Sequence, residues 1–383
     1  MKAPIFYYVD HTSRFAHNSG IQRCVRLLAS ALIDEGQGLI PVVWDRHGQR
    51  FVPPSTLRLA HLSHWNGPPL EAWHPWQDPA CVSSGWLLIV ELVCGPRNPS
   101  AQQLRAAAPG LKLAWLFHDA IPWQQAVAAG QPEAPAAVAH ATYMQAIAAD
   151  ARVFCNSRTS RLDLLCFLAE HGAHALPQLL NRIIPLPLAE TFPSERLPPP
   201  SETTGPLQLL MVSTLERRKN HQGLIKALTW LHSQGVDHWH LELIGWGADP
   251  SIVAMLRRAR QLGLPLAWRG GVSDERLQAA YANADVCVYP SFQEGFGLPV
   301  AESLWHRRPC LCSNAGALAE LSREGGCVVV NTHQWRSIVE GLSRLIEEPQ
   351  FRKELGFELE QRSCRTWHQV AKELLSDLEN GIN

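Results

Sequence analysis

The sequence lacks several patterns that would each point to a particular class of protein. No run approaches about 18 consecutive apolar residues, so no membrane-spanning helix is expected. The formal net charge is only -1 at pH 7, so binding dominated by nucleic acid or by an anionic membrane is not expected. The first apolar run ends at Asp10 and reads as a strand rather than a secretory signal. Peripheral membrane association is left open.

Metal-binding and common catalytic signatures are also missing. The ten cysteines include no Cys-x-x-Cys pair and fall largely in apolar patterns, which favours buried free thiols in a reducing compartment over disulfides or zinc. The 17 histidines have no cysteine or carboxylate cluster that would complete a ligand set, so we predict no metal site and no cofactor. There is no Gly-x4-Gly-Lys-Ser/Thr and no Gly-x-Ser-x-Gly, which removes the P-loop and hydrolase interpretations.

Apolar strand patterns alternate with amphipathic helix patterns, which predicts an α/β fold, and a length of 383 residues favours two domains. Five prolines lie between residues 193 and 206, together with Ser, Glu and Thr. Such a composition is typical of a linker. We therefore predict an N-terminal domain over residues 1–192, a linker over 193–206 and a C-terminal domain over 207–383. Residues 335–346 and 351–378 are predicted to be helical.

The most informative stretch runs from Ser291 to Glu302. It follows a strand predicted over residues 285–290 and leads into a helix predicted up to Trp305, with Pro299 expected at the first helical position. Glu294 and Glu302 flank two glycines, a proline and an apolar run. Glycine lets the backbone approach a phosphate, and the free amides of a helix start favour an anion. Glu302, expected in the first turn, could accept hydrogen bonds from sugar hydroxyls. The pattern fits a nucleotide sugar; two solvated glutamates on an ordinary turn are the alternative.

A second strand-to-helix turn, after residues 207–212, carries Arg217, Arg218 and Lys219. Arginine offers a planar fork of donors and lysine a compact charge, so this turn could hold a diphosphate. A solvated basic turn is the alternative.

The segment 46–84 is rich in Pro, His and Trp. Its apolar residues show no clean helix or strand period, so we expect loops with short pieces. Its tryptophans could form an apolar acceptor surface or pack in the core.

The two turns resemble those of retaining glycosyltransferases of the Glu-x7-Glu family. That family has the GT-B architecture, in which two Rossmann-like domains face each other across a cleft. The match is closest to bacterial mannosyltransferases of surface polysaccharide synthesis, which build O-antigen lipopolysaccharide and capsule. Arg218 and Lys219 fall on the family's phosphate-gripping positions. Thr214 stands where other branches carry a second phosphate-binding arginine, and backbone groups at Gly271 and Val272 are expected to hold the base.

The resemblance extends to two stretches of the first domain. Ser19 and Gly20 precede Ile-Gln-Arg, and in the family this glycine turn faces the donor phosphates and the acceptor. An ordinary turn between strand and helix is an equal alternative for Gly20. His118, Asp119 and Pro122 match a His-Asp-x-Ile-Pro pattern at the end of a buried strand. The family places this histidine near the donor sugar and its anomeric carbon. Asp119 is expected to orient His118 or the turn.

The resemblance implies a set of site residues. Those expected to act in catalysis are Glu294, His118, Lys219 and Arg218. Those expected to bind the donor are Gly20, Thr214, Gly271, Val272, Ser291, Gly295, Phe296, Gly297, Leu298 and Glu302. Glu294 would position sugar hydroxyls and Glu302 the ribose. Because no Asp-x-Asp occurs, Arg218, Lys219 and helix N-termini would neutralise the leaving diphosphate without a metal ion.

The implied function is retaining transfer of a hexose onto a glycan or lipid-linked glycan acceptor. The favoured hexose is mannose, with GDP-mannose as its donor. Other GDP-, UDP- or dTDP-sugars stay open as donors. The expected location is the cytoplasm, at the inner face of the cytoplasmic membrane, with no nucleic-acid partner. A covalent glutamyl intermediate is the mechanistic alternative. A catalytically inactive GT-B module that binds glycan, or a two-domain nucleotide-sugar epimerase, is the alternative function. In the family the C-terminal helix often packs on the first domain. The residues after about Ser363 could therefore belong to either domain.

Overall fold

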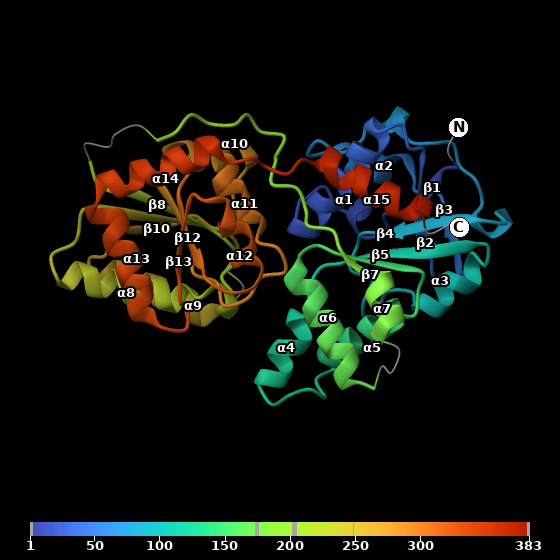
Figure 1. Ribbon diagram of the computed structural model, residues 1–383, viewed down its shortest axis with the longest axis horizontal. Helices are drawn as coiled ribbons and strands as arrows, with labels where there is room; N and C mark the ends of the chain where they lie inside the picture. The colour runs from blue at the N-terminus through green and yellow to red at the C-terminus, as the bar shows by residue number, and fades with distance from the viewer. Residues whose placement is uncertain (1–2, 173–175, 201–204, 248, 381–383) are drawn as a thin grey trace. The chain divides into compact units, whose positions relative to one another are not determined.

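A computed structural model describes residues 3–172, 176–200, 205–247 and 249–380. The chain separates into two compact units (Figure 1). Unit 1 consists of Met1–Ala189 and Arg365–Asn383, and unit 2 of Glu190–Cys364. Each unit contains its own sheet, mainly parallel in unit 1 and parallel in unit 2, covered by helices, so the predicted α/β fold class is confirmed.

The sheet of unit 1 has seven strands in the order β3-β2-β1-β4-β5-β6-β7, and the β2–β3 pair is antiparallel while the other pairs are parallel. The strand order of this sheet reverses direction next to β1, because β2 lies on one side of β1 and β4 lies on the other. Ligands of such sheets bind outside the carboxyl ends of the strands at this reversal. The strands are β1 (Ile5–Tyr8), β2 (Leu39–Asp45), β3 (Arg50–Val52), β4 (Gly85–Ile89), β5 (Leu111–Phe117), β6 (Arg152–Cys155) and β7 (Ile183–Pro185).

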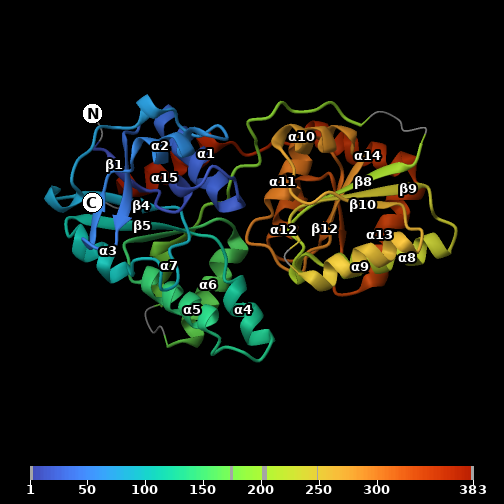
Figure 2. The same ribbon diagram turned by 180° about the vertical axis from the view of Figure 1, so that it is seen from behind.

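Helices α1, α2 and α15 lie on one face of this sheet, and α3 and α5 to α7 on the other (Figures 1 and 2). A capping box starts α1: Ser19 Oγ accepts from the Gln22 amide and Gln22 Oε1 accepts from the Ser19 amide. The helices are α1 (Gly20–Asp34), α2 (Thr56–Ser63), α3 (Ala101–Ala107), α4 (Ile121–Ala128), α5 (Pro135–Ala148), α6 (Arg158–Glu170), α7 (Leu176–Arg182) and α15 (Trp367–Asn380), with short 3-10 turns at Thr12–Arg14, Leu70–Ala72 and Pro79–Cys81.

Unit 2 has a six-stranded parallel sheet in the order β10-β9-β8-β11-β12-β13, which reverses between β8 and β11. Helices α8, α9 and α13 lie on one face and α10, α11 and α14 on the other (Figures 1 and 2). The strands are β8 (Leu207–Val212), β9 (Trp239–Ile244), β10 (Leu266–Trp268), β11 (Val286–Tyr289), β12 (Cys310–Ser313) and β13 (Cys327–Val330). The helices are α8 (His221–Ser233), α9 (Pro250–Gln261), α10 (Asp274–Asn283), α11 (Leu298–Trp305), α12 (Gly316–Leu321), α13 (Trp335–Glu347) and α14 (Pro349–Gln361), with 3-10 turns η4 (Arg217–Lys219) and η5 (Ser322–Glu324).

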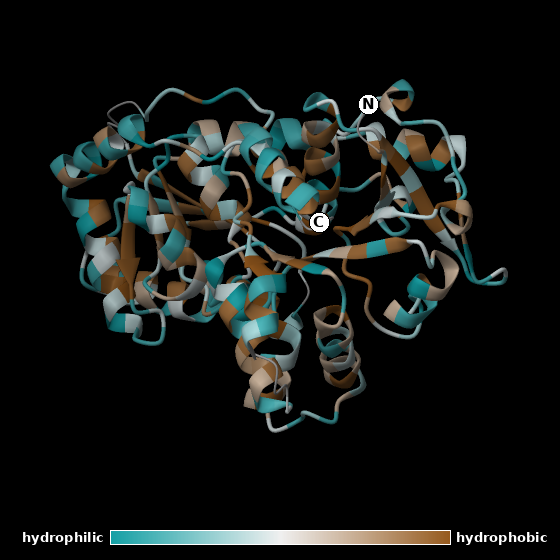
Figure 3. Cartoon of the chain, turned by 45° about the vertical axis from the view of Figure 1, so that its right-hand side comes forward, coloured by the Kyte–Doolittle hydropathy of each residue, from teal (hydrophilic) through white to brown (hydrophobic). Residues whose placement is uncertain are grey.

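Hydrophobic residues fill the strands of both units, whereas the helices carry apolar and polar stripes (Figure 3). This is the pattern expected of sheets that are covered on both faces. Among the described residues, no helix is both long and apolar enough to cross a membrane.

Part of the predicted linker, residues 201–204, lies outside the described residues. The part before it is held on unit 2: Arg196 donates to the carbonyls of Trp305 and Leu359, at 3.2 and 3.0 Å. Arg308 Nη1 donates to the carbonyl of Pro198 at 2.7 Å. The end of the chain differs from the single helix expected over 351–378. It forms α14 in unit 2 and α15 in unit 1, and α15 packs against α1.

The segment 46–84 contains the short elements β3, α2 and two 3-10 turns between loops, in line with the short pieces expected there. It holds the loop that follows β1: Arg58 pairs with Asp10 at 3.1 Å and His61 Nδ1 contacts the Ser13 carbonyl at 2.9 Å. Of its tryptophans, Trp73 is buried and Trp76 is 39% exposed. The segment therefore combines core packing with support for that loop.

Candidate functional site

The polar residues predicted in unit 2 follow β8 and β11, the two neighbouring strands at which the strand order reverses. Residues 213–220 follow β8, and residues 290–297 follow β11. The amide of Phe292 donates to the carbonyl of Arg218 at 2.8 Å, so the two loops are directly bonded to each other. Their side chains therefore meet where a doubly wound sheet binds its ligand.

The turn after β8 directs its three cations differently. Arg217 has an 87% exposed side chain and pairs with Asp249 at 3.1 Å, away from the other two. Arg218 and Lys219 are largely buried and face the loop after β11. Asn220 ends the turn in the left-handed conformation, with φ of 55°, and its Oδ1 accepts from the amide of Gly223 to cap α8. Asparagine tolerates this conformation better than most residues.

Glu294 lies between buried Lys219 and half-buried Arg218. Its Oε1 is 2.6 Å from Lys219 Nζ, and its Oε2 is 2.9 Å from Arg218 Nη1. Burial raises the pKa of Glu294, but the charges of Lys219 and Arg218 outweigh burial and leave the pKa below its ordinary value. The three predicted residues thus form one ionised cluster, with both carboxylate oxygens engaged.

A fourth residue, Glu216, was not singled out by the sequence. Its Oε2 is 2.8 Å from Arg218 Nε, and its Oε1 accepts from the hydroxyl of Thr214 at 2.9 Å. Thr214 therefore acts on Arg218 through Glu216, and the guanidinium is fixed on two edges by two carboxylates. The position of Glu216 two residues before Arg218 was a usable signal in the sequence. Spacing alone, however, does not distinguish a glutamate that pairs with the arginine from one that is solvated.

This cluster gives a pH dependence with a definite sign. Because the folded pKa of Glu294 lies below 4.5, its ionisation stabilises unit 2 above that pH, and the contribution is lost as pH falls through the folded pKa. Glu294→Gln mimics the protonated form. The stability difference between wild type and this variant should therefore shrink in acid, which thermal unfolding at a series of pH values would measure. Glu340→Gln, at an exposed position of α13, serves as control, and a pH-independent difference would contradict the prediction.

The glycine turn after β11 leads into α11. Gly297 has φ of 98° and precedes the helix, and a Cβ there would lie 2.4 Å from Leu318 Cδ2. Both the conformation and the packing therefore require glycine. The helix begins at Leu298, so Pro299 is its second residue rather than the first as expected. Four further predicted residues lie beside Gly297 or on the same loop, namely Ser291, Gly295, Phe296 and Leu298, and the first three are buried.

Glu302 lies in the second turn of α11, not the first, and is only 4% exposed. Tyr281 of α10 donates to its Oε2 at 3.1 Å, and the hydroxyls of Tyr281 and Tyr289 are 3.3 Å apart. Glu302 is thus held by a tyrosine that the sequence had not singled out.

Gly271 and Val272 follow β10, two strands away from the Glu294 cluster in the sheet. The indole of Trp246 lies over Gly271, because a Cβ on this glycine would be 2.5 Å from the indole ring. Trp246 is 72% exposed. A large exposed aromatic ring at this edge of the sheet is a third feature that the sequence interpretation missed.

Unit 1 carries the remaining predicted residues, Gly20 and His118. Gly20 is the exposed first residue of α1. His118 follows β5 and is buried, and its Nε2 donates to the carbonyl of Val90 at 2.7 Å. Burial lowers the pKa of His118, so the neutral ring carries its proton on Nε2 and leaves Nδ1 as an acceptor. Asp119 Oδ1 accepts from the amide of Ile121, the first residue of α4, at 3.0 Å, so Asp119 braces the turn before this helix.

Glu91, just after β4, is a buried carboxylate that the sequence interpretation missed. Its oxygens accept from the amides of His11 at 2.8 Å and Thr12 at 2.5 Å, which fixes the loop after β1. Burial raises the pKa of Glu91 to about 7. Among the described residues, no group of three His, Cys, Asp or Glu side chains could hold a metal ion.

Residues 195–361 match the family described as glycosyl transferases group 1. The match contains every predicted site residue of unit 2 and agrees, for this part of the chain, with the glycosyltransferase family that the two turns resemble. A solved structure, sucrose-phosphate synthase from Thermosynechococcus elongatus, aligns over 99% of both chains with a TM-score of 0.67 and 16% sequence identity. This likeness concerns the fold, and it agrees with two Rossmann-like domains of the GT-B type.

Two curated relatives come from Escherichia coli. A serotype-specific mannosyltransferase is 26% identical over 244 residues, covering 59% of this chain and 29% of that protein. An O-antigen chain mannosyltransferase is 36% identical over 121 residues, covering 31% of this chain and 32% of that protein. The chain thus spans less than a third of the length of each of these relatives.

Proposed function

Because the second unit of this chain belongs to the glycosyl transferases group 1 family, we propose that the chain is a retaining glycosyltransferase that needs no metal ion. It moves a hexose from a nucleotide diphosphate to a hydroxyl of a glycan acceptor. The observation that carries this proposal is the pair of cations, half-buried Arg218 and buried Lys219, held against Glu294 where the strand order of unit 2 reverses.

The cations supply what the leaving group needs. When the bond between the anomeric carbon and the phosphate oxygen breaks, negative charge grows on the diphosphate. Fixed donors in a site of low polarity stabilise such charge without reorganising. Arg218 is held on one edge by Glu216 and on another by Glu294, which leaves a rigid guanidinium at the end of β8. Lys219 adds a second charge from the same turn. In this proposal these two residues replace the divalent ion of metal-dependent transferases.

The sugar is handled by the carboxylates. A loose, oxocarbenium-like state forms as in glycoside hydrolysis, and a phosphate oxygen of the donor removes the proton of the acceptor hydroxyl on the same face. In this proposal Glu294 gives up part of its contact with the two cations and accepts hydrogen bonds from the sugar hydroxyls. Glu302 accepts a hydrogen bond from a ribose hydroxyl, which requires Tyr281 to move away or to share its hydrogen bond to Glu302. In the proposed reaction, neutral His118 offers Nδ1 as an acceptor to a sugar hydroxyl. A covalent adduct on Glu294 is the mechanistic alternative.

The donor and acceptor are proposed from the relatives. Both Escherichia coli proteins are named as mannosyltransferases, and one name includes the O-antigen chain. We therefore propose GDP-mannose as donor, in preference to other GDP-, UDP- or dTDP-sugars. The proposed acceptor is a growing glycan, free or lipid-linked, of a surface polysaccharide. The proposed location is the cytoplasm, with peripheral association at the inner membrane face.

The direct test is transfer by the purified chain in the presence of a chelator. GDP-mannose, UDP-glucose and a dTDP-hexose are each supplied with mannose oligosaccharide acceptors, and the anomeric configuration of the product is read by NMR. We expect transfer from GDP-mannose with retention. An inverted product would overturn the retaining mechanism, and activity only with a divalent ion would overturn the role given to the cations. Donor binding without any transfer or hydrolysis would favour an inactive glycan-binding module.

A further inference from the structure

The outer sides of α8 and α9 in unit 2 carry charge of one sign. These helices, of 13 and 12 residues, contain no Asp or Glu, although the whole chain has 35 acidic and 34 basic residues. Four basic side chains are exposed on them, namely Lys226, Arg257, Arg258 and Arg260. None of the four pairs with a carboxylate of the described residues. The two helices therefore carry a local positive charge that the net charge of -1 does not reveal.

The two helices present these cations on the same side of unit 2. Helix α8 packs against α9, and both cover one face of the sheet (Figures 1 and 2). Their apolar stripes are buried, as Leu228 of α8 and Leu256 of α9 show. Because the apolar stripe of each helix packs on the sheet, the exposed stripes of both helices point away from it. A flat partner could therefore contact the two helices at once.

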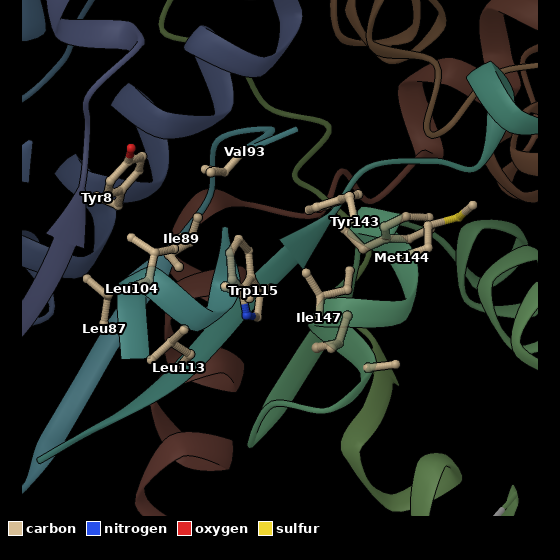
Figure 4. Packing of buried hydrophobic residues seen from close by; sticks show 14 of the residues in the cluster. Tyr8, Leu87, Ile89, Val93, Leu104, Leu113, Trp115, Tyr143, Met144 and Ile147 are labelled. Carbon is tan, nitrogen blue, oxygen red and sulfur yellow. The ribbon is translucent and has the colours of Figure 1, made fainter. Parts of the chain in front are cut away.

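Large apolar side chains are exposed among these cations. Trp115 in the core of unit 1 is buried among other apolar side chains (Figure 4). Trp230 of α8 is instead 43% exposed, and Leu262, directly after α9, is 63% exposed. Trp335 adjoins them: its ring centroid is 6.5 Å from that of Trp230 and 4.5 Å from Lys226 Nζ. Tryptophan and leucine beside lysine and arginine are typical of helices that lie in a membrane interface.

We propose that these side chains form a basic face that docks unit 2 on an anionic lipid bilayer. The face consists of Lys226, Trp230, Arg257, Arg258, Arg260 and Leu262. Its four cations bind lipid phosphates, and its two apolar side chains enter the headgroup region. A soluble polyanion such as nucleic acid matches the charges alone and offers the apolar side chains no apolar phase. Docking at this face gives the peripheral association proposed above, and it needs neither donor nor transfer.

Co-sedimentation of the full chain with lipid vesicles tests the partner. One set of vesicles contains phosphatidylcholine with phosphatidylglycerol as the anionic lipid, and the other contains phosphatidylcholine alone. Each cation near an anionic bilayer strengthens binding about fivefold, so four cations should favour the anionic vesicles by a factor on the order of 500. Binding should weaken as salt is added, because salt screens these charges. Failure to bind the anionic vesicles, or equal binding to both sets, would overturn the proposal.

A triple variant with its matched control locates the binding. Arg257→Gln, Arg258→Gln and Arg260→Gln together should weaken binding to the anionic vesicles about a hundredfold. The control removes three exposed cations outside the basic face, by Arg50→Gln, Arg323→Gln and Lys372→Gln. It should bind within about twofold of wild type, since charges farther than a Debye length from the bilayer are screened. Equal weakening in the two triple variants would show that total charge, not this face, drives binding.

The double variant Trp230→Ala with Leu262→Gln separates a bilayer from a soluble polyanion. Because both side chains are exposed, their loss should leave the fold intact, which thermal unfolding would verify. Binding to the anionic vesicles should weaken about tenfold, since two apolar side chains no longer enter the bilayer. Binding to single-stranded DNA should stay as it is in wild type. Wild-type vesicle affinity in this double variant would show that the face binds by charge alone, and a bilayer would then not be its partner.

Discussion

Replacing Lys219 by methionine should reduce turnover about a hundredfold while the protein stays folded. Lys219 is 7% exposed and its Nζ lies 2.6 Å from Glu294, so it is a fixed charge at the proposed position of the leaving diphosphate. Removing one such group costs about 3 kcal/mol of transition-state stabilisation, or about two decades of rate. Methionine keeps most of the volume, and Arg218 remains as a partner for Glu294. Transfer from GDP-mannose, measured at saturating donor, checks the prediction.

The same turn supplies the control. Arg217→Ala removes a cation two residues away whose side chain is 87% exposed and pairs with Asp249 instead of Glu294. We expect its turnover to stay within about threefold of wild type, since an exposed pair of this kind contributes little. If Lys219→Met and Arg217→Ala lost similar activity, the effect would come from the general charge of the turn. Wild-type turnover in Lys219→Met would remove the lysine from the reaction.

The parts of this architecture that repeat locally could be predicted from the sequence. Short apolar strands that end in polar turns and capped amphipathic helices recur along the chain, and that alternation requires a parallel sheet covered on both faces. Arg218, Lys219 and Glu294 could also be predicted, because each belongs to a turn at the carboxyl end of a strand, whereas their partner Glu216 was missed. The structure then brings the two turns together by pairing β8 with β11.

What the sequence could not supply are the partners that come from distant elements. Tyr281 meets Glu302, and Glu91 meets the amides after β1, because strands and helices far apart in the chain pack together. No local spacing encodes these pairs. The course of the chain near Arg362 shows the same limit: its neighbours favour a continuing helix, yet α14 ends at Gln361 and Arg362 is extended. Tertiary bonds of this one side chain outweigh the local preference.

Arg362 should therefore be among the residues whose loss most destabilises unit 2. Its guanidinium is fully buried and pairs with Glu190 at 2.6 Å, which joins the first residue of unit 2 to a segment near its end. It also donates to the carbonyls of Leu321 and Gly325, at 2.8 and 3.0 Å. Arg362→Met leaves a carboxylate and two carbonyls without these donors. Removing one partner of a buried pair costs about 3–5 kcal/mol, which chemical denaturation of the full chain would detect.

The appropriate comparison is an ion pair of unit 2 that is open to solvent. Arg269 is 3.1 Å from Glu242 with a 54% exposed side chain, and Glu242 keeps Arg276 as a second partner. Arg269→Ala should cost less than about 1 kcal/mol. The double variant Arg362→Met with Glu190→Gln should recover part of the loss, because the carboxylate left unpaired by the first change becomes neutral. If the double variant were no more stable than Arg362→Met alone, the pairing with Glu190 would not be the source of the effect, and the two carbonyl contacts would account for it.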